Sequence, residues 1–231
     1  MTKVRRTPWS AVGPLAGLCA LGENSARLAA QFFVAFYRRR LPHIYEIAQP
    51  AFLTWSLRGS LPLNRAFGED ALTSGEIFCA MDRLLDESRS GPHYLTQPAM
   101  ADMVVEAIYY NSNTLRHYEL HAFVVMPNHV HLLITPTMAL PKLTRSLKGI
   151  TAKHANQILG LTGTAFWNEE SYDRLVRDKA EFDRIRGYIE QNPVRAGLVR
   201  QATEFRWSSS GWPAGGPAAD QGVRRTVKPS L

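Results

Sequence analysis

The sequence predicts an α+β fold in which an antiparallel sheet is flanked by helices. Bulky and β-branched residues at 51–57 are typical of a strand, and the breaker Gly59 follows them. Two segments with the helical spacing of apolar residues come next, at 75–90 and 99–110. Residues 120–134 then read as a hairpin. A strand, two helices and a hairpin in this order favour an α+β sandwich.

The helix expected at residues 75–90 is amphipathic. Its apolar positions are Ile77, Met81, Leu84 and Leu85, and Asp, Arg and Glu residues lie between them. Residues three and four apart share one side of a helix, so these positions form one apolar side.

The second half of the chain is predicted to be mostly helical. A helix is expected at 143–159, a short basic segment at 171–177, and a last helix at 178–192. Pro193 ends this last helix in our prediction, because the residue before a proline is pushed out of the helical region.

One folded domain with two extensions accounts for the 231 residues. We expect a flexible N-terminal extension at 1–40, the folded domain at 41–210, and a disordered basic tail at 211–231, which is rich in Gly, Pro and Ala. The apolar stretches are interrupted before they reach the ~20 residues that a bilayer requires, so no membrane anchor is expected.

Charge and cysteine content narrow the class of protein. Lys and Arg outnumber Asp and Glu by 27 to 20, and the pI of about 9.6 favours a polyanionic partner such as nucleic acid. Cys19 and Cys79 are the only cysteines and form no C-x-x-C pair. This excludes a zinc knuckle and a disulfide framework, and it fits a reducing cytoplasm.

The predicted hairpin carries the first candidate site. His129 and His131 are separated by one apolar residue in the outgoing strand, so both imidazoles leave the same face of the sheet. Pro127 and Asn128 suit the centre of the turn before them. Two imidazoles on one face are half of a metal site. A His-x-His pair in a strand also occurs in purely structural roles.

The last predicted helix offers further candidates. Tyr188 lies four residues before Asn192 and three before Gln191, so each pair shares a helix face. A phenol and an amide oxygen can then point at one metal. Tyr188 also fits a packing role beside Ile185, and the spacing alone leaves both interpretations open.

Taken together and in this order, these motifs resemble the single-tyrosine HUH transposases. The resemblance is strongest to their REP-associated branch, named after repetitive extragenic palindromes, and it covers residues 41–210. It rests on M-P-N-H-V-H-L-L at 126–133, Tyr188-Ile189, N-P-V-R-A-G-L-V at 192–199, and the supporting segments 146–149, 172–178 and 207–209.

The resemblance implies a ferredoxin/RRM-like HUH endonuclease fold and an enzyme that cuts and rejoins single-stranded DNA beside hairpins, often as a homodimer. Carried over by residue, Tyr188 becomes the nucleophile that forms a 5′-phosphotyrosine. His129 and His131 become metal ligands and Asn192 the third ligand, with Gln191 as the alternative. The expected ion is Mg²⁺ or Mn²⁺, and the expected location is the cytoplasm, at the nucleoid.

Four basic residues of the second half of the chain are candidates for DNA contacts. Lys148, Lys153, Arg174 and Arg177 are predicted to bind phosphates. The alternative to an enzyme is a domesticated relative that binds hairpin DNA without cutting it. A histidine-triad hydrolase is excluded, because Leu133 stands where a third histidine would be needed.

Overall fold

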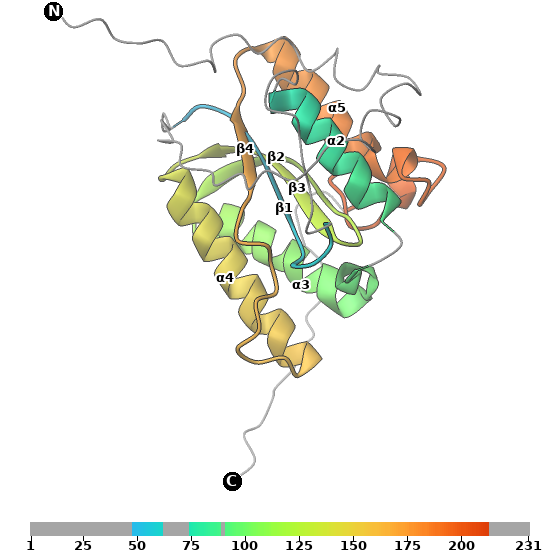
Figure 1. Ribbon diagram of the computed structural model, residues 1–231. Coiled ribbons are helices and arrows are strands. Elements are labelled where there is room, and N and C mark those ends of the chain that lie inside the picture. The colour runs from blue at the N-terminus through green and yellow to red at the C-terminus, as the bar shows by residue number, and fades with distance from the viewer. Residues whose placement is uncertain (1–47, 62–73, 89–90, 213–231) are drawn as a thin grey trace, which may run out of the picture.

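A computed structural model describes residues 48–61, 74–88 and 91–212 (Figure 1). Its elements are β1 (Ala51–Ser56), α2 (Ser74–Glu87), η3 (Tyr94–Thr96), α3 (Pro98–Tyr109), η4 (Tyr110–Thr114), β2 (Tyr118–Val125), β3 (His129–Pro136), α4 (Leu140–Leu159), β4 (Tyr172–Leu175), α5 (Lys179–Arg195) and η5 (Ala202–Glu204). The extension predicted at 1–40 lies outside the described residues. Among those described, no helix is long and apolar enough to cross a bilayer.

The four strands form one antiparallel sheet in the order β2-β3-β1-β4. This order, with helices between β1 and β2 and between β3 and β4, is the ferredoxin-like arrangement. The predicted α+β class is therefore confirmed. β3 is a central strand, and its pairing with β1 sets Thr54 opposite His131 and Ser56 opposite His129.

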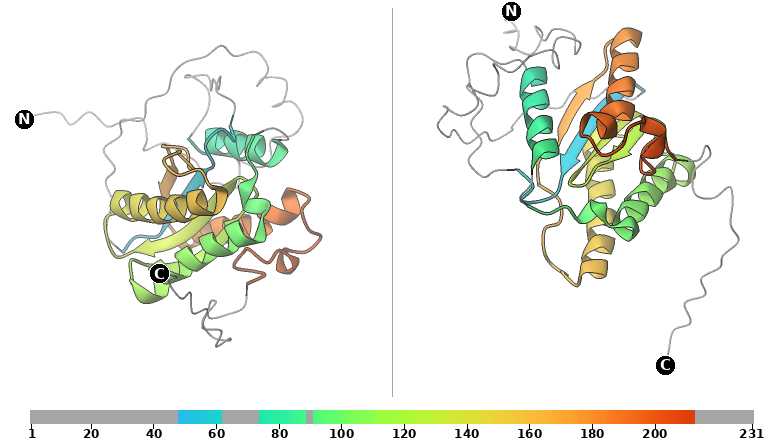
Figure 2. Two further views of the ribbon diagram at one scale, coloured as in Figure 1. Left: turned by 90° about the horizontal axis from the view of Figure 1, so that it is seen from below. Right: turned by 90° about the vertical axis from the view of Figure 1, so that its right-hand side faces the viewer.

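Helices cover both faces of the sheet (Figures 1 and 2). α3 and α4 pack on one face, where Leu53 and Trp55 of β1 point, and α2 and α5 pack on the other, where Phe52 points. Because both faces are covered, every residue of β1 is buried. The strand is therefore mostly apolar, and its polar residues Thr54 and Ser56 are buried on the side that faces the histidines.

The buried side of α2 differs from the side predicted. Phe78, Asp82 and Leu85 are buried, whereas Leu84 is 36% exposed. Phe78 packs edge-on against Phe52 of β1, with ring centroids 5.1 Å apart. Because this large ring packs on the sheet, the side of α2 that carries Phe78 faces the interior. Asp82 lies on that same side, so its carboxylate is buried.

α5 runs one turn further than predicted, so the prediction that Pro193 ends it is wrong. Pro193 is buried inside the helix, which reaches Arg195. The backbone N–H of Ala196 still donates to the carbonyl of Asn192, and the helix gives way at Gly197, whose φ is 70°. A left-handed glycine is a common helix end, and the burial of Asn192 and Pro193 outweighs the local preference of the residue before proline.

Two segments near the C-terminal end pack more than the sequence suggested. Residues 172–175, expected only as part of a basic segment, form the edge strand β4 on β1. Trp212 falls within the predicted tail, yet it packs on the α3 side of the core, with its ring 6.4 Å from that of Tyr109. The rest of the predicted tail, 213–231, lies outside the described residues.

Candidate metal and nucleophile site

The paired histidines lie inside the protein, on the sheet face covered by α2 and α5. His129 and His131 are both fully buried, and their Nε2 atoms are 3.1 Å apart. The alternation of β3 places both rings on one face, because residues two apart in a strand point the same way. Leu133 continues this stripe into the core on the same face.

Hydrogen bonds behind the two rings fix their orientation. Asn128 donates through Nδ2 to the carbonyl of Leu85, so its Oδ1 is left to accept from Nδ1 of His129 at 2.7 Å. Thr54 Oγ1 lies 2.7 Å from Nδ1 of His131. With the proton of His129 held on Nδ1, its Nε2 lone pair faces the neighbouring ring. Partners of this kind orient metal-binding histidines in proteins.

Asp82 of α2 completes a group of three side chains. Its Oδ1 atom lies 3.0 Å from Nε2 of His131 and 3.5 Å from Nε2 of His129. Ligand atoms bound about 2.1 Å from one ion lie roughly 3.0 to 3.4 Å apart, which matches these spacings. Oδ1 is also buried without a hydrogen-bond partner. This Asp/His/His group can therefore bind a metal ion.

The ionisation of these groups suits a cation. Burial, reinforced by His131, lowers the pKa of His129 to about 3, so the imidazole is neutral at pH 7 and keeps its lone pair. Burial acts to raise the pKa of Asp82, but the two histidines and the Tyr188 hydroxyl outweigh it and hold that pKa well below its usual value. A carboxylate and imidazole nitrogens are ordinary ligands for divalent ions.

α5 brings Tyr188 and Asn192 to the same carboxylate. The Tyr188 hydroxyl donates to Oδ2 of Asp82, and Asn192 Nδ2 lies 3.3 Å from that oxygen. Asn192 is fully buried, 3.4 Å from Nε2 of His131, and its Oδ1 atom has no hydrogen-bond partner. Gln191, the alternative ligand, is exposed. The structure thus brings Asn192 to the site and leaves Gln191 at the surface.

The nucleophile candidate is held as a neutral phenol. Burial and the neighbouring Asp82 raise the pKa of Tyr188 well above 10, while Arg195 acts in the opposite direction. The Tyr188 ring lies in an aromatic cluster with Phe52 and Phe78, at centroid distances of 6.3 and 5.8 Å. Its hydroxyl consequently points at Asp82 from an apolar wall, and it needs a cation nearby to react at neutral pH.

A second carboxylate lies at the rim of the group. Asp86 Oδ1 is 3.9 Å from Nε2 of His129 and is buried without a hydrogen-bond partner. Burial and the charge of Asp82 raise the pKa of Asp86 to about 8. Asp86 is therefore mostly protonated at neutral pH in the absence of a cation.

Sequence reasoning missed Asp82 and Asp86, because the acidic residues of this segment count there only as the polar part of an amphipathic helix. A signal was present, since like charges four residues apart destabilise a helix. Asp82 and Asp86 form such a pair in a segment that also carries apolar residues. A repulsive pair of this kind indicates a function that offsets its cost.

The predicted DNA contacts are not gathered at the metal group. Arg174 and Arg177 both bond to the buried Glu181, at 2.6 and 3.1 Å. The Lys148 ammonium donates to the carbonyls of residues 168 and 169, and Lys153 is exposed on the same helix, α4. α4 packs on the face of the sheet opposite the histidines.

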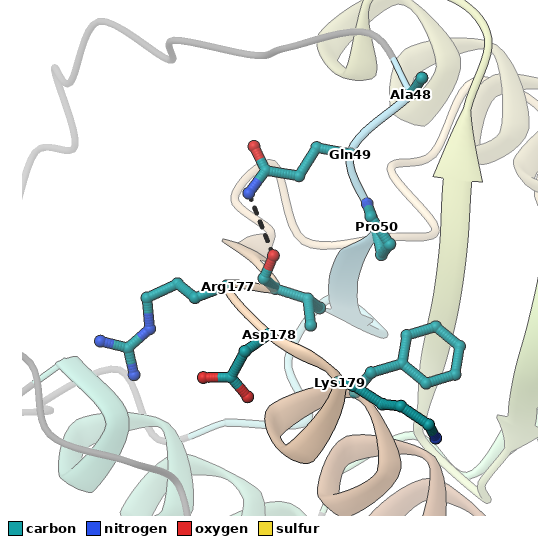
Figure 3. Close-up of a pocket in the computed structure, with 8 residues that line it drawn as sticks. Ala48, Gln49, Pro50, Arg177, Asp178 and Lys179 are labelled. Atoms are coloured by element: carbon teal, nitrogen blue, oxygen red, sulfur yellow. Dashed lines mark hydrogen bonds between the residues drawn. The ribbon is translucent and has the colours of Figure 1, made fainter.

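A separate surface hollow of about 610 Å³ lies at the start of α5 (Figure 3). Gln49 donates through Nε2 to the carbonyl of Val176 along its wall, and Arg177 and Lys179 border it. The hollow adjoins the pair Ala51–Leu175, at the other end of β1 from the residues opposite the histidines. It is therefore distinct from the metal group.

Comparison with known proteins points to one family. Residues 93–192 match the family model described as transposase, IS200-like. The matched segment contains His129, His131 and Tyr188 and ends at Asn192, whereas Asp82 precedes it. The match confirms the resemblance to IS200-like transposases over that segment. No curated protein sequence matches.

Two solved structures resemble this chain in part. One is a REP-associated tyrosine transposase bound to a REP hairpin, with 20% identity, a TM-score of 0.47, and coverage of 76% of this chain and 82% of that one. The other is assigned as a transposase from Deinococcus radiodurans R1, with 20% identity, a TM-score of 0.37, and coverage of 67% and 98%.

Proposed function

Starting from the match of residues 93–192 to the IS200-like transposases, we propose that this protein cuts and rejoins single-stranded DNA. Tyr188 is the nucleophile, and a divalent metal ion assists it. The observation that carries the proposal is the position of the Tyr188 hydroxyl, which donates to the same Asp82 carboxylate that faces both imidazole Nε2 atoms. A nucleophile and a cation site thus share one side chain.

The metal is held by four side chains in this proposal. His129 and His131 would supply Nε2 atoms and Asp82 would supply Oδ1. Asn192 would supply its amide oxygen once its side-chain amide turns, because its Nδ2 atom lies 3.3 Å from Asp82 and 3.4 Å from His131. Mn²⁺ is favoured over Mg²⁺ because two ligand atoms are nitrogens, and Zn²⁺ and Fe²⁺ accept the same set. When bound, the ion neutralises charge on the phosphate oxygens of DNA.

The reaction exchanges one phosphate ester for another. The Tyr188 oxygen attacks phosphorus and forms a new P–O bond, while the bond from phosphorus to the 3′-oxygen breaks. The phenolic proton ends on the released 3′-oxygen, so the products are a 5′-phosphotyrosine and a 3′-hydroxyl. The ester energy is retained in the adduct, so a second 3′-hydroxyl can reverse the step and rejoin the strand.

We propose DNA with hairpins as the substrate. The sequence motifs that resemble the REP-associated branch support this choice, and the net charge of +7 suits a polyanion. A single strand suits the buried site, because its phosphates can approach without a paired partner strand.

A covalent-capture experiment tests the proposal. The protein is mixed with Mn²⁺ and a single-stranded library that has a constant hairpin stem and randomised flanks. DNA labelled at the 3′ end is expected to migrate with the protein on a denaturing gel, and DNA labelled at the 5′ end is expected to be released with an extendable 3′-hydroxyl. Tyr188→Phe should abolish both products. Tyr110→Phe is the control, because Tyr110 is 55% exposed and outside the site.

The alternative function is hairpin binding without cleavage. It would show as a shift in DNA mobility by the wild-type protein with no covalent product under Mn²⁺, Mg²⁺, Zn²⁺ or Fe²⁺. An adduct that persists in Tyr188→Phe would contradict the assignment of the nucleophile.

A further inference from the structure

We infer that Arg195 binds the scissile phosphate beside the Tyr188 nucleophile, an inference that rests on the proposed function. In the sequence, Arg195 is part of the motif at 192–199 but lies beyond the predicted end of the helix at Pro193. In the structure α5 continues to Arg195. Tyr188, Asn192 and Arg195 then occupy positions i, i+4 and i+7, which lie on one side of a helix.

The guanidinium of Arg195 lies directly against the nucleophile. Its Cζ atom is 4.2 Å from the centroid of the Tyr188 ring. Its Nη2 atom is 3.9 Å from Oδ2 of Asp82, the oxygen that accepts the Tyr188 hydroxyl. A phosphorus atom approached by that hydroxyl would have its non-bridging oxygens within reach of the same guanidinium.

The solvent exposure of Arg195 indicates from which side DNA can reach the metal group and Tyr188. The side chain of Arg195 is 40% exposed, whereas that of Asp82 is 1% exposed and both histidines are fully buried. Arg195 thus lies between the buried metal group and solvent. A phosphate entering the site from solvent meets the guanidinium before the nucleophile.

The contacts of Arg195 are compatible with a phosphate ligand. The 3.9 Å separation from Asp82 exceeds a hydrogen bond, so that pair is electrostatic. The guanidinium carbon lies over the face of the Tyr188 ring, and a guanidinium carries a fork of N–H donors that fits two phosphate oxygens.

The positive charge of the Arg195 guanidinium gives it a role in the reaction. Attack by the Tyr188 oxygen adds negative charge to the non-bridging oxygens while the bond to the 3′-oxygen breaks. A fixed guanidinium beside those oxygens stabilises this charge without gaining or losing a proton. Arg195 in this way adds a second positive group on the solvent side of the phosphate.

A charge-neutral substrate tests this inference. Once the wild-type cleavage position is mapped, a methylphosphonate at that position removes the phosphate charge. On ordinary DNA, Arg195→Ala should lower the rate of adduct formation ~100-fold or more, and Arg195→Lys should lower it less. On methylphosphonate DNA, Arg195→Ala and wild type should react within ~3-fold of each other, because the phosphate charge that the guanidinium offsets has been removed.

A binding measurement gives a readout independent of chemistry. In a Tyr188→Phe background, Arg195→Ala should weaken binding of ordinary DNA ~10-fold and leave binding of methylphosphonate DNA unchanged. Arg186→Ala is the control, since Arg186 lies on the same helix and pairs with Glu190 at the surface.

Three outcomes are distinguishable. Equal losses on both substrates would assign Arg195 a structural role and overturn the inference, as would a wild-type rate for Arg195→Ala on ordinary DNA. If wild type itself forms no adduct with any DNA, the proposed function fails rather than this inference alone.

Discussion

At the scale of single residues, Asp82 joins the two halves of the site. One carboxylate oxygen faces the imidazoles of His129 and His131, and the other accepts the hydroxyl of Tyr188. Any cation held by the first oxygen is therefore coupled to the nucleophile through a single side chain. Removal of this carboxylate would disturb metal binding and tyrosine position together.

Thr54 supports the site from behind, and its removal should weaken metal binding. Its hydroxyl lies 2.7 Å from Nδ1 of His131 and orients that ring. We expect Thr54→Val to lower Mn²⁺ affinity by roughly 10- to 100-fold, the usual effect of losing such a support. Isothermal titration calorimetry with Mn²⁺ measures this directly.

Thr135 provides a matched control for that substitution. It makes the same kind of contact, 2.7 Å from Nε2 of His121, in the same sheet. His121 lies outside the metal group, so Thr135→Val should leave Mn²⁺ affinity unchanged. Equal effects of the two substitutions would show that the loss comes from the sheet and not from His131.

At the scale of elements, the contact between β4 and the start of α5 depends on Glu181. This fully buried carboxylate bonds to the guanidiniums of Arg174 and Arg177, and the N-cap Asp178 accepts from its backbone N–H. Two residues predicted to bind DNA thus help to fix the helix that carries Tyr188. Their substitution would act on the position of α5.

Loss of the Glu181 charge should destabilise the fold. Glu181→Gln leaves the guanidinium of Arg174 without its anion in a position where that side chain is only 10% exposed. We expect a loss of about 3 kcal/mol in the free energy of unfolding at pH 7, as for other broken buried pairs. Urea denaturation provides the measurement.

The pH dependence of this loss follows from the Glu181 pKa. Burial acts to raise it, but the backbone N–H of Arg177 and the two guanidiniums hold it below 4.5. A carboxyl group whose pKa is lowered by folding contributes its full stabilisation above its unfolded pKa. This contribution is lost as the pH falls through the lower, folded pKa. The difference between wild type and Glu181→Gln should therefore shrink below pH 4.5. Glu190→Gln, which breaks a surface pair on α5, should cost at most about 0.5 kcal/mol.

At the scale of the whole molecule, the metal group joins three separate elements. Asp82 comes from α2, the histidines from β3 and Asn192 from α5. An ion bound to all three stabilises the folded state and has no equivalent site in the unfolded chain. At a concentration 100 times its dissociation constant it contributes about 2.7 kcal/mol.

This contribution should appear as a higher melting temperature. For a domain of this size we expect Mn²⁺ to raise it by roughly 5 to 10 °C, and EDTA to reverse the rise. Differential scanning fluorimetry can follow both. His131→Ala removes a ligand and should abolish the shift; an undiminished shift in this variant would place the ion elsewhere.

The N-terminal segment is expected to be dispensable for the site. Every residue of the metal group and the nucleophile lies at or after Asp82. Deletion of residues 1–40 should therefore leave adduct formation within about 3-fold of that of the full chain, measured by the same covalent capture. An insoluble or inactive truncated protein would show that this segment is part of the folded domain.

The sequence by itself determined the elements with strong local periodicity. Alternation in 129–134 placed both histidines on one face of a strand, and helical spacing placed Tyr188 and Asn192 on one side of a helix. These relations depend only on residues that are near neighbours in the chain. Local geometry fixes such relations before any packing is known.

The tertiary structure decided which distant elements meet. Docking of Phe78 turned α2 so that Asp82 faces the histidines, and packing carried α5 past Pro193 so that Arg195 lies over Tyr188. Neither outcome follows from local preference, because each depends on buried contacts between residues far apart in the sequence. The rotation of one helix and the length of another thus complete the site.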